Sequence, residues 1–253
     1  MIAFIRAVIR VMLLILSLIL PLIQVCLMWL PRRGPFYAIP QLWCRVVTRI
    51  MGIKIVTHGT LVTETPALFI ANHASYLDIP VLQTVVPGSY IAKSEISGWP
   101  LFGWLADLQG TIFVKRVKTE AKNQANVMSQ RLKAGGTLIL FAEGTTSDGC
   151  RLLPLKSSLL TVAQDARVVQ PVTIGFTALD GLPVGRTHRY IYAWIGDESL
   201  VPHLMRLLMQ GEVTVDITFH APIYDSLTNR KILSNQLDTV MRDGLNKTLT
   251  QAA

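Results

Sequence analysis

The chain alternates between short apolar runs and longer stretches in which apolar residues recur every three or four positions. The short runs predict buried strands, and the periodic stretches predict helices. Strands that alternate with helices indicate an α/β domain with a mixed, largely parallel central sheet flanked by helices. The predicted strands are residues 53–56, 67–70, 90–92, 111–114, 137–141, 168–176, 190–195 and 213–219. The predicted helices are residues 79–86, 101–108, 118–134, 157–166, 200–210 and 228–249.

The first part of the chain has a different pattern. Val11 to Pro31 is a run of 21 residues without a charge, which as a helix would span about 30 Å, enough for a bilayer core. We expect an uncleaved, hydrophobic membrane-anchoring helix with a candidate kink at Pro21. A signal peptide with Arg6 and Arg10 as its basic end is the alternative. The pattern leaves open whether the helix spans the bilayer or lies within one leaflet.

A second helix is predicted directly after this segment. Its basic residues Arg45 and Arg49 lie on a different face from its apolar residues, which predicts an amphipathic helix at a membrane surface, with Trp43 at headgroup level. An ordinary helix packed on the domain is an equal alternative. We therefore divide the chain into residues 1–51, an anchor plus amphipathic helix, and residues 52–253, a folded domain. The apolar residues with helical spacing are Ile39, Leu42, Trp43, Val46, Val47 and Ile50.

Composition and charge support membrane contact. The chain is 51% hydrophobic and 16% charged, with a mean hydropathy of +0.42, which is apolar for a soluble protein. No acidic residue precedes Glu64, so most of the net charge of +8 lies in the apolar first part, as suits an anionic membrane surface. A nucleic-acid binder would more often carry a basic stripe on its folded domain. The three cysteines lack metal-binding spacing, which favours a reducing, cytosolic setting without a metal site.

Candidate chemistry begins where the strand predicted at 67–70 ends. His73 follows this strand, and Asp78 follows five residues later. Ligand sites in α/β folds are built at such strand ends. A histidine whose ring is held by an aspartate is a general base, and a substrate that brings its own hydroxyl needs no serine nucleophile. The alternative is a turn histidine followed by an aspartate that caps a helix.

Three further motifs lie at the end of a predicted strand or inside one. Lys115 and Arg116 end a strand that starts after Gly110, where they could bind a phosphate or lie in a solvated loop. Glu143 and the residues after it could bind an oxyanion or a polar headgroup, or form a capped loop. Pro171 lies inside a predicted strand and marks an edge or a bulge. If the motif of His73 and Asp78 is counted as the first, the third motif comprises Glu143, Gly144, Thr145 and Thr146.

Together these four blocks resemble the glycerolipid, or lysophospholipid, acyltransferase family, whose bacterial type member is 1-acyl-sn-glycerol-3-phosphate acyltransferase. The resemblance covers roughly residues 50–220. Each block is weak alone, but the joint match in order and spacing is specific. The matching positions are Asn72, His73, Ser75 and Asp78 in the first block, Gly110, Phe113 and Arg116 in the second, Phe141, Glu143, Gly144 and Thr145 in the third, and Pro171 in the fourth.

The resemblance implies acyl transfer from acyl-CoA or acyl carrier protein to 1-acyl-sn-glycerol-3-phosphate, giving phosphatidic acid in phospholipid biosynthesis. His73 would be the general base, and Asp78 would fix its tautomer. Backbone N–H groups near Ser75 or Gly144 would bind the oxyanion. No metal or further cofactor is implied, and the site should face the cytosol at the inner membrane. The expected substrate-binding residues are Asn72, Ser75, Lys115, Arg116, Glu143, Gly144, Thr145 and Thr146.

Two positions depart from the family pattern. Ala142 and Thr146 stand where the family commonly has proline and arginine. The missing arginine removes one partner for a phosphate, so another lysolipid, notably lyso-ornithine lipid, is an alternative acceptor. Two other functional classes are a non-catalytic lipid-binding protein and a serine hydrolase. For the hydrolase, the candidate nucleophiles Ser75 and Ser147 both lie outside a G-x-S-x-G turn.

Overall fold

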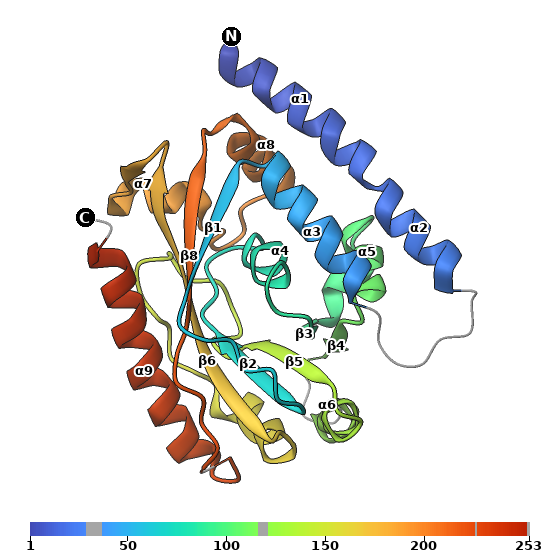
Figure 1. The fold of residues 1–253 in the computed structure, drawn as a ribbon, viewed down its shortest axis with the longest axis vertical. Helices are drawn as coiled ribbons and strands as arrows, with labels where there is room; N and C mark the ends of the chain where they lie inside the picture. Colours follow the sequence, from blue (N-terminus) through green and yellow to red (C-terminus); the bar gives the residue numbers. More distant parts are fainter. Residues whose placement is uncertain (29–36, 116–120, 226, 252–253) are drawn as a thin grey trace.

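A single mixed sheet organises the part of the chain that the structure, a computed structural model, describes: residues 1–28, 37–115, 121–225 and 227–251 (Figure 1). Within these ranges the sheet has eight strands, and the order is β1-β8-β6-β2-β5-β3-β4, with β7 paired to β6. The strands are β1 Ile53–His58, β2 Ala67–Ala71, β3 Ser89–Lys93, β4 Ile112–Val114, β5 Thr137–Phe141, β6 Val168–Leu179, β7 Leu182–Pro183 and β8 Val213–Phe219.

The sheet is largely parallel, as predicted. Strands β6, β2, β5, β3 and β4 all run in one direction, whereas β8 is antiparallel to β6, and β1 is parallel to β8. The helices are α1 Ile2–Ser17, α2 Ile19–Met28, α3 Ala38–Ile50, α4 Asp78–Gln83, α5 Phe102–Leu108, α6 Ala121–Lys133, α7 Arg186–Tyr192, α8 Leu200–Met209 and α9 Arg230–Gln251, with 3-10 helices η1 Ser94–Gly98 and η2 Ser157–Asp165.

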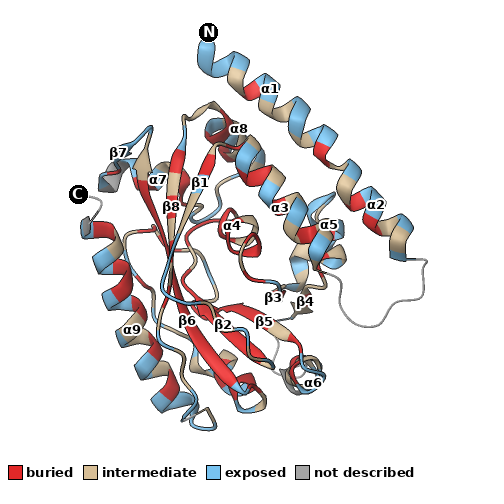
Figure 2. Cartoon of the chain, viewed as in Figure 1, coloured by how far each residue is buried: buried red, intermediate tan, exposed pale blue. Residues whose placement is uncertain are grey.

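Helices cover both faces of the sheet, and each face has its own core (Figure 2). Side chains alternate along a strand, so Phe69 of β2 faces one core and Ile70 faces the other. The first core packs against α1, α3, α4 and α8, and the second packs against α6, η2 and α9. Helix α9 contributes a stripe at every fourth position, namely Leu233, Leu237, Met241, Leu245 and Leu249.

One predicted strand is wrong. Residues 186–192 form helix α7, so the run at 190–195 is not a strand. Tyr192 stacks on Phe176 of β6 at a centroid distance of 5.1 Å, and Arg189 donates hydrogen bonds to the carbonyls of Phe176 and Leu249. Periodicity alone cannot distinguish a short apolar run in a strand from one in a buried helix. The helix predicted at 157–166 is a 3-10 helix, and the first helix begins at Ile2, well before Val11.

The N-terminal segment Ile2–Met28 forms a long rod along one side of the domain (Figure 1). It breaks at Leu18 between α1 and α2, because Pro21 has no N–H to give the carbonyl of Ser17. By length and composition this segment could cross a membrane, and most of its surface is exposed. Residues 29–31, the last part of the predicted membrane anchor, lie outside the described ranges, as do the arginines at 32 and 33.

The polar side chains of this segment point toward the domain. Arg10 donates hydrogen bonds to the carbonyls of Leu208 and Gln210, at 3.1 and 2.7 Å, and Gln24 donates one to the carbonyl of Leu108 at 2.7 Å. These carbonyls lie at the C-terminal ends of α8 and α5, where helices lack internal partners. Arg10 therefore caps a helix of the domain. The opposite face of the rod is an apolar surface, which includes Phe4, Ile5, Ile9, Met12, Leu16, Ile19 and Ile23.

Helix α3 packs on the domain, as the second of its two interpretations proposed. Cys44, Val47 and Thr48 are buried, and Arg45 donates a hydrogen bond to the carbonyl of Thr84 directly after α4. The indole of Trp43 donates to the hydroxyl of Ser17 in α1 at 3.1 Å. Helix α3 therefore lies between the N-terminal rod and α4.

Replacing Arg10 should detach part of this rod. Arg10→Met removes two hydrogen bonds from a charged donor, and we expect the free energy of unfolding to fall by about 2 kcal/mol. The matched control is Arg49→Met, because Arg49 is exposed on α3 and should tolerate the same change. Thermal unfolding in detergent would measure both variants. Equal melting temperatures for the two would contradict the capping role of Arg10.

Candidate active site

The predicted site residues gather at one edge of the sheet. Strands β2, β3, β4 and β5 are parallel, so their carboxyl ends lie on the same side, where α/β folds build ligand sites. His73 follows β2 by two residues, Glu143 follows β5 by two residues, and Lys115 follows β4 directly. The parallel sheet thus brings three motifs that are distant in sequence to one edge.

His73 and Asp78 form a hydrogen-bonded pair. The ring nitrogen Nδ1 of His73 lies 2.9 Å from Oδ2 of Asp78. The same oxygen accepts the backbone N–H groups of Ala74 at 2.7 Å and Ser75 at 2.9 Å. Asp78 is fully buried, and its Oδ1 has no hydrogen-bond partner among the described residues. The carboxylate therefore points back into the loop before α4 and does not cap that helix, which argues against the helix-cap interpretation.

Further contacts of its ring and its backbone also fix His73 in place. Its ring stacks on Phe141 with a centroid distance of 4.0 Å and an angle of 12° between the planes, and Phe141 stacks on buried Tyr90. Its backbone carbonyl accepts the N–H of Ser147 at 2.7 Å. The side chain is 17% exposed, and Nε2 is the ring nitrogen that Asp78 leaves for chemistry. The imidazole is thus fixed in position, with one nitrogen able to take a proton.

Two residues expected to bind substrate lie inside the protein. The amide of Asn72 donates to the carbonyl of Ile174 at 2.9 Å and accepts the N–H of the same residue at 2.7 Å. Ser75 is fully buried, and its hydroxyl accepts the N–H of Leu77. Both side chains hold the loop from within, because tight turns leave backbone groups that need partners. Neither side chain reaches a surface where a substrate could bind.

Glu143 is also buried, with 1% of its surface exposed. Its Oε1 accepts the backbone N–H of His73 at 2.6 Å, and its Oε2 accepts the N–H of Leu153 at 2.7 Å. Burial raises the pKa of Glu143 to about 7, although both hydrogen bonds favour the ionised form. This carboxylate contacts protein backbone on both oxygens, which differs from the expected contact with a substrate.

Only some of the residues expected to bind substrate are exposed among those that the structure describes. Lys115 and Thr145 are exposed, whereas Thr146 donates its hydroxyl to the carbonyl of Trp194. Gly144 has a φ of +67° and donates its N–H to the carbonyl of Phe141, so this N–H is engaged, as is that of Ser75. Neither of these two N–H groups is therefore open to an oxyanion. Arg116 lies outside the described residues, so its role stays a prediction.

The sequence analysis missed a segment that joins the first and third motifs. The N–H of Trp194 donates to the carbonyl of Ala74 at 2.8 Å, while its carbonyl accepts the Thr146 hydroxyl. The Tyr76 hydroxyl lies 2.9 Å from Nδ1 of buried His203. Trp194 fell in the run that was interpreted as a strand, and its contacts are made through the backbone. No residue type signals such contacts.

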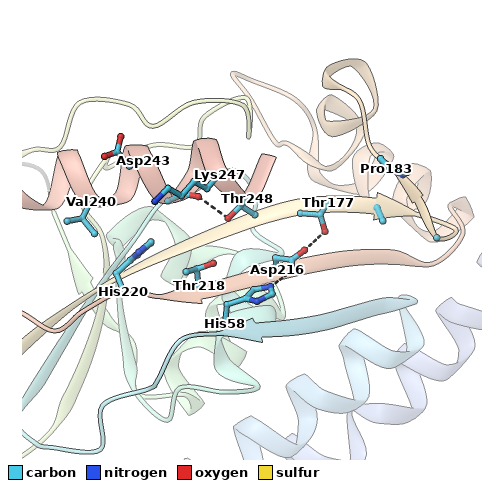
Figure 3. A pocket seen from close by; sticks show the side chains of 13 residues that line it. His58, Thr177, Pro183, Asp216, Thr218, His220, Val240, Asp243, Lys247 and Thr248 are labelled. Carbon is cyan, nitrogen blue, oxygen red and sulfur yellow. Dashed lines mark hydrogen bonds and ion pairs between the residues drawn. The ribbon is translucent and has the colours of Figure 1, made fainter. Parts of the chain in front are cut away.

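A separate groove of about 700 Å³ lies between α9 and strands β1, β6 and β8 (Figure 3). His58 and Asp216 are 2.5 Å apart there, and Thr177 also donates to Asp216. Asp216 alternates along β8 with residues of the first core, so this pair lies on the opposite face of the sheet from His73. None of the predicted site residues that the structure describes lines the groove. Across the described ranges, no cluster of His, Cys, Asp and Glu side chains could hold a metal ion.

Comparisons with known proteins agree with the resemblance. A sequence model of the Acyltransferase family matches residues 52–175. The lyso-ornithine lipid O-acyltransferase of Rhizobium meliloti is 40% identical, over 98% of this chain and 89% of that protein. The 1-acyl-sn-glycerol-3-phosphate acyltransferase of Neisseria gonorrhoeae is 34% identical, over 60% of this chain and 58% of that protein.

A solved structure shares the fold. The 1-acyl-sn-glycerophosphate acyltransferase PlsC of Thermotoga maritima aligns with a TM-score of 0.62 and 19% identity, over 96% of this chain and 97% of that chain. The likeness covers the N-terminal rod as well as the sheet. At this identity it supports the arrangement of the elements and does not extend to the substrate.

Glu143 should make stability depend on pH. Its pKa is about 7 when folded and 4.5 in its ordinary state, so the folded protein holds an extra proton between these values. The contribution of this group to stability therefore falls as pH rises from about 4.5 to 7 and then levels off. Glu143→Gln should remove this slope. Urea unfolding at pH 5 and pH 8 would measure it, and parallel curves for wild type and variant would contradict it.

Proposed function

The chain belongs to the acyltransferase family and is an enzyme of that class, and from this premise we propose that it transfers a fatty acyl group from a thioester to the free hydroxyl of a lysolipid. The observation that carries the proposal is the contact of 2.9 Å between His73 Nδ1 and a buried carboxylate oxygen of Asp78. This pair leaves Nε2 to act on a hydroxyl, and a thioester is activated enough to need no serine nucleophile.

In the proposed reaction, Nε2 of His73 takes the proton of the lipid hydroxyl as its oxygen attacks the thioester carbonyl carbon. The C–S bond then breaks, and the leaving thiolate takes the proton from the imidazolium. Asp78 accepts a hydrogen bond from Nδ1–H throughout, which fixes the tautomer and stabilises the imidazolium. The buried Asp78 carboxylate also holds two backbone N–H groups, so it can remain in place while His73 gains and loses its proton.

Lyso-ornithine lipid is the acceptor that we favour. The lyso-ornithine lipid O-acyltransferase of Rhizobium meliloti is 40% identical over 98% of this chain, whereas the 1-acyl-sn-glycerol-3-phosphate acyltransferase of Neisseria gonorrhoeae is 34% identical over 60% of it. Thr146 stands where an arginine could bind a phosphate, and its hydroxyl is directed to Trp194. An ornithine headgroup has a carboxylate and an ammonium in place of a phosphate. Lys115, Arg116 and Thr145 are the residues that we assign to this headgroup.

The second candidate acceptor is 1-acyl-sn-glycerol-3-phosphate. Lys115 follows β4 directly, and Arg116 is the next residue in the sequence; two adjacent cations suit a phosphate through a point charge and a paired donor. The donor, acyl-CoA or acyl carrier protein, belongs to the same proposal, with no cofactor beyond it.

We assign the enzyme to a membrane surface, on the cytosolic side of the inner membrane. The outward face of α1 and α2 is apolar along its whole length, and Leu101, Phe102 and Trp104 beside α5 extend it. Helix α5 contacts α2, so these residues belong to one surface. Apolar surface of this extent is stable when lipid covers it. A lipid acceptor then reaches the enzyme without leaving the bilayer.

The first test compares two histidine–aspartate pairs of the same chain. His73→Ala should lower kcat by roughly 10²- to 10⁴-fold, because it removes the general base. His58→Ala is the matched control, because His58 also pairs with an aspartate but lies on the other face of the sheet. The measurement is acyl transfer in detergent-solubilised membranes. Wild-type activity for His73→Ala would remove His73 from the mechanism.

The second test offers lyso-ornithine lipid and 1-acyl-sn-glycerol-3-phosphate in competition. We expect wild-type enzyme to favour lyso-ornithine lipid, and Thr146→Arg to shift the ratio toward the phosphate by about tenfold, which corresponds to about 1.4 kcal/mol. Gln164→Arg, at an exposed position of η2 outside the predicted site, controls for added charge alone. A wild-type preference for the phosphate acceptor would select the second candidate. Acylation of neither lipid would reject both.

A further inference from the structure

We propose that Glu143 is a positioning residue for this acyl transfer, whose carboxylate fixes the backbone of His73 and does not contact substrate. The inference rests on the proposed function, because it assigns a role within the same site. It differs from the sequence-based expectation, which placed Glu143 among the residues that bind the acceptor.

The first step is the shape of the turn that carries Glu143. Gly144 donates its N–H to the carbonyl of Phe141, and its φ of +67° turns the chain sharply after Glu143. Phe141 and Glu143 therefore lie in one turn, and both contact His73. The ring of Phe141 stacks on the imidazole of His73, while the carboxylate of Glu143 accepts the backbone N–H of His73.

The second step is the choice of side chain. The carboxylate accepts two backbone N–H groups, those of His73 and Leu153, at 2.6 and 2.7 Å. An ionised acceptor makes shorter and stronger hydrogen bonds than a neutral one. A glutamine would offer one acceptor oxygen and turn its NH₂ group toward the other N–H. An aspartate is one methylene shorter and cannot span the same two donors. The two donors thus account for glutamate at this position.

The third step is the position of the carboxylate relative to substrate. Glu143 is 1% exposed, and each oxygen already accepts a short hydrogen bond. Because the side chain is enclosed, a substrate hydroxyl or ammonium could reach it only if the surrounding loops opened, which would separate the carboxylate from the backbone N–H groups of His73 and Leu153. Such unpaired donors are costly, so a substrate contact is disfavoured.

The fourth step is the charge around Glu143. The charged groups that act on or face it are Asp78 before α4, Asp148 in its own loop, and Arg242 on α9. Burial outweighs the hydrogen bonds and raises the pKa of Glu143 to about 7. Protonation of Glu143 would place a hydroxyl hydrogen opposite the backbone N–H of His73 or of Leu153, and the hydrogen bond from that N–H would be lost. Glu143 should therefore contribute to the loss of activity at acidic pH.

The experiment compares Glu143→Gln with the wild type and with Glu64→Gln. Glu64 accepts hydrogen bonds from Tyr224 and Arg167, far from His73 in the structure, and so controls for loss of a bonded carboxylate. We expect Glu143→Gln to lower kcat at least tenfold, with KM for the lysolipid and for acyl-CoA each unchanged within twofold. Glu64→Gln should match the wild type. A several-fold rise in the lysolipid KM, or an unchanged kcat, would overturn the proposal.

The pH profile separates positioning from a loss of folded protein. The acid limb of the wild-type kcat should be steeper than that of Glu143→Gln, because only the wild type has the carboxylate of Glu143 to protonate there. Equal steepness of the two acid limbs would overturn the proposal. A lower folded fraction in the variant would reduce the measured rate by the same factor at every pH and would leave the shape of the profile unchanged. If Glu143→Gln does not fold, Glu143→Asp takes its place, with lowered kcat and unchanged KM expected. A wild-type enzyme that acylates no lysolipid would reject the proposed function instead.

Discussion

The site depends on one buried carboxylate oxygen. Oδ2 of Asp78 accepts three N–H groups, from the His73 ring and from the backbones of Ala74 and Ser75. A carboxylate without such partners would be too costly to bury. The loop therefore has to close around Asp78 for the domain to fold, and closing it turns the imidazole into a fixed orientation. The same three contacts thus serve the stability of the loop and the orientation of the His73 ring.

The third motif completes what Asp78 begins. Residues 141–147 contact His73 through a ring, a carboxylate and a backbone N–H, which belong to Phe141, Glu143 and Ser147. These contacts form because β2 and β5 are neighbours in parallel register, with Ala71 paired to Phe141. The motif that was predicted to be a headgroup pocket therefore also holds His73 of the first motif in place. Thr145 is the part of it that faces outward.

Sequence patterns predicted the elements well where one periodicity dominated. The strands predicted at 137–141 and 213–219 have the observed bounds of β5 and β8. Residues 190–195 failed because Tyr192 is buried against Phe176 from a helix, a tertiary contact that no local pattern reports. The spacing of His73 and Asp78 predicted their pairing. The sequence could not show which way the side chains of Asn72 and Glu143 point. Their partners are backbone groups of residues far away in the sequence, Ile174 for Asn72 and His73 for Glu143.

The N-terminal rod and the base belong to one packed body. Helices α1 and α2 contact α3, and α3 contacts α4, whose first residue is Asp78. The rod is held by polar side chains that face inward, Arg10 and Gln24, so its apolar face is left outward along its full length. A rod that floated free on a linker would not set the height of the site above a membrane. Because this one is capped onto α8 and α5, a membrane that covers its apolar face also sets the position of His73. In the membrane-bound arrangement that we propose, helix packing would then set the distance between the lipid and His73, which suits an acceptor whose hydroxyl lies at a nearly constant depth.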